Sequence, residues 1–577
     1  MLTFARIFTL FFVTSLFYPA SAFAVKSILE LQPFKKTGTA SLGEGTNLRT
    51  YNLVNLNSNI NKWFLLQEFL RKGASTNTIY HLENIDPQNS LNIISENDNV
   101  YLEISKTNSK ENCSILSEEI KQLVRESIKS KDSYTPVCNN LLYIRNFTPG
   151  RQSAKEQVTG FLREHIWGGE KITNIVKTSI YQDEHLITAE TKKAKNNNVK
   201  QIHNKTNLNM PKSAEIDSSA TAANSTLVPK SLGVSLKGDL KANGLQAGEW
   251  YPTLHNPNIF VSVISPKLIS KDIMQSYPTF VGNLDKVEQD SLVYLISINL
   301  EQNNLEYMIG TEHPSVEWSS RALPSVMDKK IPGPDGIASI EPLISTGRIN
   351  PGLTRKTTMS FIGGFKRNHS AFRWGKLAET NQGSHYGVIE NGVIYSRLNP
   401  ELATLIIDKA GKVDLLTWKS EFDSTLLPEI KHARQNGVSI IEKLDANGKS
   451  VPGSLVKYWG AGNWSGSVDS KQRALRAALC IQEHNGKKHL IYGYFSSSTP
   501  NTLARVFQAY NCSYAFHLDM NALEHTYLAI YHWVEKQFHV EHLIQGMEVL
   551  DSKFNNRVLP RFLGMSDNRD FFYLISK

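Results

Sequence analysis

Apolar residues in the second half of the chain either alternate with polar ones or form short continuous runs, the two patterns typical of half-buried and fully buried strands. Asn485-Gly486 separates two such runs and predicts a tight hairpin turn. Together the segments predict a strand-rich domain, and they are "NIFVSVISP", "SLVYLISINL", "TTMSFIGGF", "YGVIENGVIYS", "ATLIIDKAGKVDLLTW" and "AALCIQEHNGKKHLIYGYF".

One helix interrupts these strands near the C-terminal end. Thr499 is suited to the N-cap and Pro500 to the first helical position. Its predicted buried stripe is Leu503, Val506, Phe507 and Tyr510. The chain then enters the alternating segment "CSYAFHLDMN", in which Ala515, His517 and Asp519 are expected on one face. The strand is predicted to end just after Asp519.

The N-terminal part has a different pattern. "SILSEEIKQLVRESIKSK" places Ile115, Leu116, Ile120, Leu123, Val124 and Ile128 on one stripe and predicts an amphipathic helix. The segments "NVYLEIS" and "NNLLYIRNF" around it read as strands. We therefore expect a small α+β module at 25–188. It has no constellation of catalytic residue types, so a binding or assembly role is the default, and its protein partner is unknown.

The first 24 residues have the pattern of a secretory signal peptide. Arg6 precedes an apolar run from Ile7 to Tyr18, and Ala22-Phe23-Ala24 is a small-x-small cleavage site. A retained membrane anchor is the alternative, but the run is short for a membrane span. We expect cleavage near Ala24 and a secreted or periplasmic protein without a transmembrane segment in the mature chain.

Formal net charge is +9 over 577 residues, which raises the question of a nucleic-acid partner. Much of the excess lies in 189–230, where lysines outnumber acidic residues and neither aromatic residues nor glycines occur. Such a composition predicts a disordered basic linker rather than a binding face. We therefore expect no nucleic-acid partner, a module at 25–188 before the linker, and a C-terminal region at 231–577. Weak attraction to an anionic envelope polymer stays open.

The chain has four cysteines, and export gives them meaning. Four cysteines allow three pairings, and the local ones, Cys113 with Cys138 and Cys480 with Cys512, keep each bridge inside one expected domain. A zinc site is the alternative, but CxxC spacing is absent.

The order of several motifs at about 330–550 resembles the phosphodiester glycosidase family. The resemblance rests on "FIGGF", on the hairpin "YGVIENGVIY", on "IIDKAGKVDLLTW", on "RALRAAL" and on "GKKHLIYGYFSSSTPNTLARVFQAYNCSYAFHLD". It implies an α+β domain that hydrolyses a bond between a sugar and a phosphate. Two motifs depart from the family pattern: Ile362 replaces an asparagine before Gly363-Gly364, and Met520-Asn521-Ala522 replaces a glycine run after Leu518-Asp519.

A basic loop follows Gly363 and Gly364. It carries Lys366, Arg367 and His369, and cationic side chains beside exposed backbone amides suit a phosphodiester anion. A basic surface loop without a ligand is the alternative.

Three further residues are candidates for catalysis. Asp519 ends a strand, the placement of many catalytic groups, and it matches the Leu-Asp of the family. The resemblance also favours Arg473 over Arg476, which a strand would turn to the opposite face. His385 lies in "NQGSHYG" and titrates near neutral pH, although a turn histidine bonded to backbone is the commoner outcome.

Other chemistries have less support in the sequence. The late histidines His517, His525, His532, His539 and His542 lack the HExxH and HxxEH spacings of zinc proteases. G-x-S-x-G, P-loop and dinucleotide patterns are absent, so we expect no metal and no cofactor. A metal-dependent hydrolase using these histidines stays open as a third class.

The sequence thus favours an exported α+β hydrolase that cleaves a glycosidic phosphodiester bond in an anionic or phosphorylated glycan. Lys366 or Arg367 would bind the phosphate, with Arg473 and Asp519 at the cleaved bond. The alternative is a module of the same fold that binds an envelope glycan or a protein without turnover, because the glycine motifs are altered.

Overall fold

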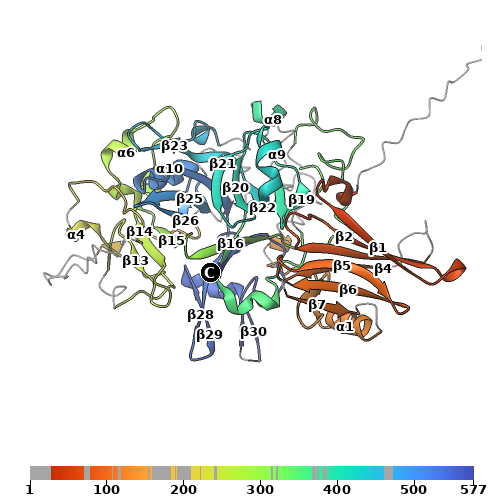
Figure 1. Cartoon of the computed structure of the whole chain (residues 1–577). Helices are drawn as coiled ribbons and strands as arrows, with labels where there is room; N and C mark the ends of the chain where they lie inside the picture. The colour runs from red at the N-terminus through yellow and green to blue at the C-terminus, as the bar shows by residue number, and fades with distance from the viewer. Residues whose placement is uncertain are drawn as a thin grey trace, which may run out of the picture.

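The computed structural model describes residues 27–577 apart from 71–77, 107, 115–117, 154–155, 159–182, 189, 192–208, 221, 239–243, 313–315, 320–321, 367–371, 373–375, 381–385, 460–471 and 556. It is strand-rich, as predicted, and antiparallel pairing joins the strands within its sheets (Figure 1). The expected signal peptide lies outside the described residues and stays a prediction. Among the described residues no helix is long and apolar enough to cross a membrane.

The largest sheet organises the C-terminal region. Its eight strands, in spatial order, are β13 (Tyr251–Pro252), β14 (Ile259–Ile264), β15 (Val293–Asn299), β26 (Lys487–Ser498), β25 (Ala474–His484), β27 (Tyr514–Met520), β23 (Ser439–Leu444) and β24 (Ser450–Pro452). We call it the central sheet. Its middle strands are buried on both faces, which explains their continuous apolar runs.

Two five-stranded sheets accompany the central sheet. One has the order β16 (Asn303–Met308), β32 (Phe571–Ser576), β17 (Thr357–Ile362), β28 (Leu528–Val534) and β29 (Gln537–His542), and we call it the second sheet. The other has the order β19 (Val393–Ser396), β18 (Val388–Glu390), β22 (Ile430–Gln435), β20 (Ala403–Asp408) and β21 (Val413–Thr417). A single apolar core joins all three, with Phe361 and Phe572 packed near Tyr492 of the central sheet.

The predicted helix is confirmed as α10 (Pro500–Ala509), and it covers the other face of the central sheet. Leu503 and Phe507 are completely buried there, and Phe507 packs edge-on against Phe495 of β26. The remaining described helices of this region are short: α4 (Ala222–Ser225), α6 (Lys271–Gln275), α7 (Lys286–Asp290), α8 (Lys376–Thr380) and α9 (Phe422–Thr425). The hairpin at Asn485-Gly486 is also confirmed, and both residues have the positive φ of a tight turn.

The N-terminal module forms two sheets of its own. One has the order β1 (Lys36–Leu42), β2 (Arg49–Asn55), β3 (Trp63–Phe69), β4 (Thr78–Asn84), β9 (Leu142–Arg145) and β8 (Tyr134–Val137). The other contains β5 (Ser90–Glu96), β6 (Asn99–Lys106) and β7 (Ser109–Cys113). The predicted amphipathic helix appears as α1 (Glu118–Lys129), in which Leu123 is still 39% exposed.

Both predicted disulfides are present, Cys113–Cys138 and Cys480–Cys512, which fits a protein of an oxidising compartment. The second bridge joins β25 to the turn that leads into β27. It therefore fixes the start of the strand that carries Asp519.

The described part of 189–230 differs from the predicted disordered linker. Leu227 in β11 (Thr226–Val228) is completely buried, and β11 pairs with β10 (Glu190–Thr191) and with β12 (Leu245–Gln246). Ile216 forms a bridge to Ile269. The low average hydrophobicity of the segment concealed a few apolar residues, and these are enough to anchor it to the C-terminal region.

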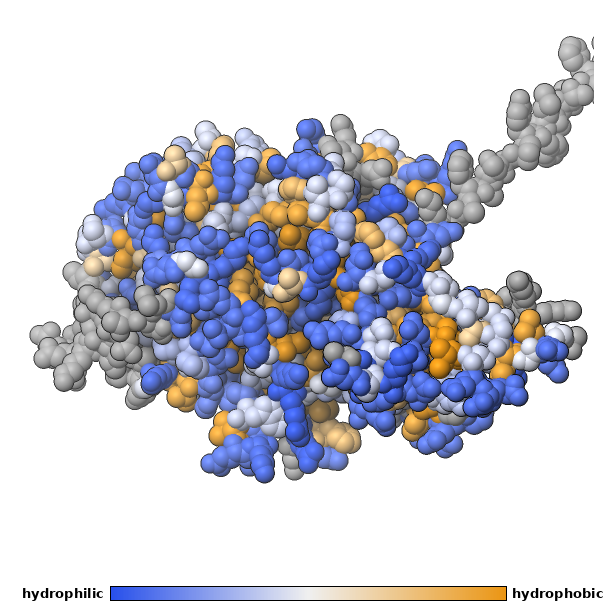
Figure 2. Space-filling model, viewed as in Figure 1, coloured by the Kyte–Doolittle hydropathy of each residue, from blue (hydrophilic) through white to orange (hydrophobic). Residues whose placement is uncertain are grey.

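The surface seen in Figure 2 is mostly hydrophilic, with hydrophobic residues in small groups between the polar ones. Two hairpins, β28–β29 and β30 (Ser552–Phe554) with β31 (Arg557–Leu559), project from the lower edge of the molecule in Figure 1.

Candidate functional site

A bulge at the end of β27 decides the direction of Asp519. His517 pairs with Ala478 of β25 and Met520 pairs with Arg476, so three steps along β27 oppose two along β25. Such a bulge re-aims a side chain. His517 packs against Phe365, whereas Asp519 reaches Arg569, which lies just before β32 of the second sheet. The predicted shared face of His517 and Asp519 is therefore wrong, and Asp519 lies between the two sheets.

Asp519 is a buried carboxylate with a cationic partner. Arg569 donates from Nη1 to Oδ2 of Asp519, and the backbone amide of Met520 donates to Oδ1 at 2.8 Å. Burial raises the pKa of Asp519 to about 6, although the nearby Arg569 charge acts in the opposite direction. A carboxyl group that titrates close to neutral pH is suited to general acid–base chemistry.

Arg569 also binds a second carboxylate, that of Glu156. Its Nη2 and Nε lie 2.9 and 3.1 Å from Oε1 of Glu156, and Asn568 Nδ2 donates to the same oxygen at 3.1 Å. Burial acts to raise the pKa of Glu156, but the charges of Arg569, His525 and Lys366 hold it well below its usual range. Glu156 is therefore ionised, and its carboxylate occupies the side of Arg569 that Asp519 leaves free.

Lys366, which the sequence predicted as a phosphate-binding residue, contacts two carboxylates of this group. Its Nζ lies 3.3 Å from Glu156 Oε1 and 3.2 Å from Glu312 Oε2, and its side chain is 18% exposed. We call Asp519, Arg569, Glu156, Lys366 and Glu312 the carboxylate–cation cluster. The other two predicted residues of the loop, Arg367 and His369, lie outside the described residues.

Gly363 and Gly364 lie beside the cluster, but their backbone amides are occupied. The Gly363 amide donates to the carbonyl oxygen of Asp570 at 2.8 Å, and the Gly364 amide donates to its Oδ2 at 3.3 Å. A Cβ at Gly363 would lie 2.2 Å from Asp570 Oδ2, and one at Gly364 would lie 2.7 Å from Asn436 Oδ1. The glycines thus allow the chain to approach Asp570 closely, a packing role that differs from the predicted phosphate contact.

Asp570 is held by further partners. Arg434 Nε donates to its Oδ2 at 2.7 Å, and the hydroxyl of Tyr307 donates to the same oxygen at 2.9 Å. All three side chains are buried. This network fixes the chain just after Arg569 and so positions the guanidinium that faces Asp519.

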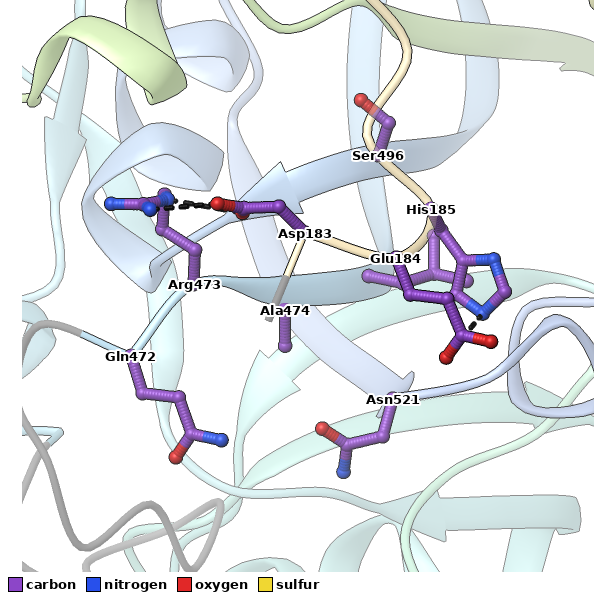
Figure 3. A pocket seen from close by; sticks show the side chains of 9 residues that line it. Asp183, Glu184, His185, Gln472, Arg473, Ala474, Ser496 and Asn521 are labelled. Atoms are coloured by element: carbon purple, nitrogen blue, oxygen red, sulfur yellow. Dashed lines mark hydrogen bonds and ion pairs between the residues drawn. The ribbon is translucent and has the colours of Figure 1, made fainter. Parts of the chain in front are cut away.

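Arg473 lies at a separate pocket near the end of β27. Its Nη2 lies 2.7 Å from Asp183 Oδ2 (Figure 3). Its Nη1 bonds to Asp285. The pocket is lined by Asp183, Glu184, His185, Gln472, Arg473, Ala474, Leu475, Ser496 and Asn521. Two carboxylates therefore hold Arg473, and the structure brings it beside Asn521 rather than to Asp519.

The remaining predicted residues are placed as follows. His385 lies outside the described residues. The late histidines have different partners: His525 Nδ1 is 2.6 Å from the Met520 carbonyl, and His542 lies 3.1 Å from Asp551. His532 stacks on His539 and on His255. Within the described part of the chain, no group of three or more histidine, cysteine or acidic residues has the geometry to hold a metal ion.

Sequence reasoning missed Arg569, Glu156 and Asp570. The sequence "DNRD" at 567–570 does carry one usable signal, because three charged residues stand directly before the buried strand β32. A charged run at the start of a strand lies where that strand enters the sheet, and side chains from the ends of neighbouring strands meet there. Nothing local marks Glu156, which approaches from the N-terminal side of the chain.

Comparison with protein-family models gives no match, and neither does comparison with curated proteins. Among solved structures, the catalytic domain of zebrafish N-acetylglucosamine-1-phosphodiester alpha-N-acetylglucosaminidase, auto-inhibited by its pro-peptide, is 11% identical, with 65% of this chain and 99% of that chain covered and a TM-score of 0.29. A putative exported protein from Burkholderia pseudomallei is 9% identical, with coverage of 49% and 74% and a TM-score of 0.20. A hypothetical protein from Synechocystis is 9% identical, with coverage of 94% and 99% and a TM-score of 0.25. These values show weak structural similarity and carry no argument about activity.

Proposed function

We propose that the protein is an exported hydrolase that cleaves a glycosidic phosphodiester bond in an anionic glycan, and that the carboxylate–cation cluster is its active site. The observation that carries the proposal is Asp519, a buried carboxyl group with a pKa of about 6 that shares a cluster with two cations. The motif resemblance at about 330–550 supports the same reaction class. Arg473, predicted at the cleaved bond, has no part in this proposal because Asp183 and Asp285 hold it.

The proposed reaction needs one base and one anion site. Water attacks the anomeric carbon while the bond from that carbon to the phosphate oxygen breaks, and the phosphate leaves with the bonding electrons. Ionised Asp519 accepts a proton from the attacking water. Arg569 and Lys366 stabilise the negative charge of the departing phosphate, with Arg569 offering paired donors and Lys366 a point charge.

Glu156 must leave before a phosphate can bind. The cluster contains two cations, Arg569 and Lys366, against the carboxylates of Asp519, Glu156 and Glu312. A phosphate would add negative charge to a group that already has an excess of it. The Glu156 carboxylate thus occupies the position proposed for the substrate anion, and displacement of this side chain opens the site.

The test is release of sugar from a panel of sugar-1-phosphate diesters, with wild type compared with Glu156→Gln and Asp519→Asn. We expect faster release with Glu156→Gln, because the competing charge is gone, and none with Asp519→Asn. Glu96→Gln, an exposed position in β5 of the N-terminal module, is the matched control and should equal wild type. Equal release by wild type and Asp519→Asn would overturn the proposal.

A second candidate function is binding of an anionic glycan without turnover. It is favoured by the Gly363 and Gly364 amides, which donate to Asp570 and so are not presented to a ligand. A folded Glu156→Gln variant that retains an anionic glycan on a column, yet releases no sugar from any diester, would establish this alternative.

A further inference from the structure

Two neighbouring hairpins carry large apolar side chains on their surfaces. Near the turn of the β28–β29 hairpin, Trp533 is 44% exposed and Val534 is exposed as well. Near the turn of the β30–β31 hairpin, Phe554 is 65% exposed and Val558 is also exposed. A single exposed apolar residue needs no explanation, whereas four of them on two projecting hairpins are typical of an interaction surface.

The two hairpins start from a shared base. The hydroxyl of Tyr531 in β28 donates to the carbonyl oxygen of Arg561, which follows β31, at 3.2 Å. His542 at the end of β29 lies 3.1 Å from Asp551, which precedes β30. These contacts hold the two bases together, and both hairpins project in the same direction from the rest of the molecule (Figure 1). The protein therefore presents both apolar ends on one side.

A row of aromatic rings supports the longer hairpin. In the described pairing, β17 accompanies β28 only as far as Ile530, so the end of the hairpin is a two-stranded ribbon. Tyr531 stacks on Phe538 of the opposite strand with ring centres 5.9 Å apart, and Phe538 lies 5.1 Å from Trp533. Cross-strand aromatic pairs stabilise such a ribbon. The row thus keeps Trp533 in place at its end.

Basic residues stand among the exposed apolar ones. The two ends, 533–538 and 552–559, contain Lys536, Lys553 and Arg557 against the single acid Glu535. All three basic side chains are exposed, and hydrophobic and hydrophilic residues lie together at both projections in Figure 2. Basic residues are attracted to anionic lipid headgroups, and tryptophan concentrates at the boundary between lipid and water. The two ends thus complement a surface that is anionic outside and apolar beneath.

Shape and composition favour a lipid surface over other partners. Protein interfaces of standard size bury about 800 Å² on each side and are depleted in lysine. The β28–β29 end is narrow and convex, because Glu535 and Lys536 form a tight turn with positive φ, and Lys536 and Lys553 stand beside the apolar side chains. A soluble anionic polymer would attract the lysines but offers no apolar phase to Trp533 and Phe554.

We propose that the ends of the β28–β29 and β30–β31 hairpins bind the surface of an anionic phospholipid membrane. The four exposed apolar side chains enter the boundary between headgroups and acyl chains, and the three basic side chains lie against the headgroup phosphates. The proposal does not depend on hydrolysis at the carboxylate–cation cluster.

Sedimentation with phospholipid vesicles tests the proposal. The purified protein should bind vesicles of equal parts phosphatidylcholine and phosphatidylglycerol at least about tenfold more tightly than vesicles of phosphatidylcholine alone, since each basic residue contributes several-fold. Phe554→Ser should weaken binding to the mixed vesicles by about tenfold, because an aromatic side chain no longer leaves water. If wild type binds neither vesicle, or if Phe554→Ser binds the mixed vesicles as tightly as wild type, the proposal is wrong.

Tyr458→Ser is the matched control for loss of an exposed aromatic residue. Tyr458 is 62% exposed at the end of η7 (Val456–Tyr458), which packs against α10 on the other face of the central sheet. This variant should bind the mixed vesicles like wild type. Equal loss of binding in Tyr458→Ser and Phe554→Ser would contradict a site at the hairpin ends.

Tryptophan fluorescence gives a second readout that does not depend on the amount of bound protein alone. Trp533→Phe retains an aromatic ring beside Phe538, so the hairpin should keep its shape. Addition of mixed vesicles should shift the emission of wild type to shorter wavelength, because Trp533 enters a less polar environment, and should leave the emission of Trp533→Phe unchanged. A shift of the same size in both proteins would place the lipid contact elsewhere.

Two other occupants of the hairpin ends give different results. If the protein binds polygalacturonate, a soluble anionic polymer, as tightly as mixed vesicles, the ends recognise charge alone. If wild type without lipid sediments as a dimer and Phe554→Ser as a monomer, a second copy of the chain covers the ends. Either result refutes the membrane proposal.

Discussion

Replacement of Asp519 by asparagine is expected to stabilise the protein at neutral pH. The carboxyl group is buried and titrates at about 6, against 3.8 for an ordinary aspartate. Because the folded state disfavours the ionised form, folding carries a penalty at every pH above about 6. Such a difference in pKa corresponds to about 3 kcal/mol. Asparagine has nearly the same shape and never ionises, so Asp519→Asn removes that penalty.

The Asp519→Asn variant also loses a hydrogen bond. The Asp519 oxygens accept from both Arg569 and the Met520 amide, and an asparagine supplies only one acceptor for these two donors. One lost hydrogen bond is worth about 1 kcal/mol. The expected net gain is therefore about 2 kcal/mol above pH 6. It shrinks between pH 6 and pH 4 and reverses to a loss of about 1 kcal/mol below, where the wild-type carboxyl is protonated as well.

Urea unfolding of both proteins at pH 7.5 and pH 4 measures this difference. Asp567→Asn is the informative comparison, because that carboxylate is also buried but accepts two bonds from Arg561 at 2.6 and 2.9 Å. Removing one partner of such a pair costs about 3–5 kcal/mol, so this variant should be less stable at pH 7.5. If Asp519→Asn is likewise destabilised at pH 7.5, the Arg569 pair outweighs desolvation and the reasoning about Asp519 fails.

Three further predictions concern stability. Burial raises the pKa of Glu390 to about 8, so Glu390→Gln should be more stable than wild type at pH 9, with the gain falling as pH drops from 8 to 4.5, as measured by urea unfolding at both limits. Arg145→Met should lose about 3 kcal/mol in the same assay, because it removes the 2.9 Å partner of the buried Glu83 carboxylate, which then keeps only Lys62 at 3.6 Å. Removal of the Cys480–Cys512 bridge by a double serine substitution should lower stability by about 2–4 kcal/mol, and a reducing agent should lower the unfolding temperature of this variant by less than that of wild type, because only the Cys113–Cys138 bridge is left to reduce.

Local signals in the sequence predicted what local forces determine. The Asn485-Gly486 turn depends on two adjacent residues and is confirmed. Thr499 stands at the predicted N-cap position of α10, although its hydroxyl donates to the distant Glu288 at 2.6 Å rather than to the helix. The two disulfides followed from sequence proximity within each expected domain. The position of Asp519 at the end of a strand was also visible. Its direction was not, because the bulge in β27 depends on pairing with β25 and leaves no mark in the alternation.

The choice between Arg473 and Arg476 shows where sequence reasoning stopped. Their spacing correctly indicated opposite environments. The motif resemblance favoured Arg473, yet its guanidinium is held by Asp183 and Asp285, which come from far away in the chain. Arg476 is the buried residue, and its lack of an ion-paired carboxylate among the described residues appears only when the strands on both sides are placed. Partners distant in sequence thus determine the surroundings of each arginine.

Glu156 and Asp183 are two acidic residues that each pair with an arginine distant in sequence. Glu156 pairs with Arg569, and Asp183 pairs with Arg473. The two substitutions should nevertheless differ. Glu156→Gln removes excess negative charge from the carboxylate–cation cluster, whereas after Asp183→Asn the carboxylate of Asp285 still neutralises Arg473.

Calorimetry with inorganic phosphate distinguishes the two variants. A like charge at about 4 Å contributes about 4 kcal/mol near a protein surface, so its removal should strengthen binding at Arg569 by tenfold or more. Glu156→Gln should thus show one more phosphate site than wild type, and Asp183→Asn should match wild type. If Asp183→Asn gains the additional site instead, the anion position belongs to Arg473, and the pocket beside Asn521 becomes the better candidate for the active site.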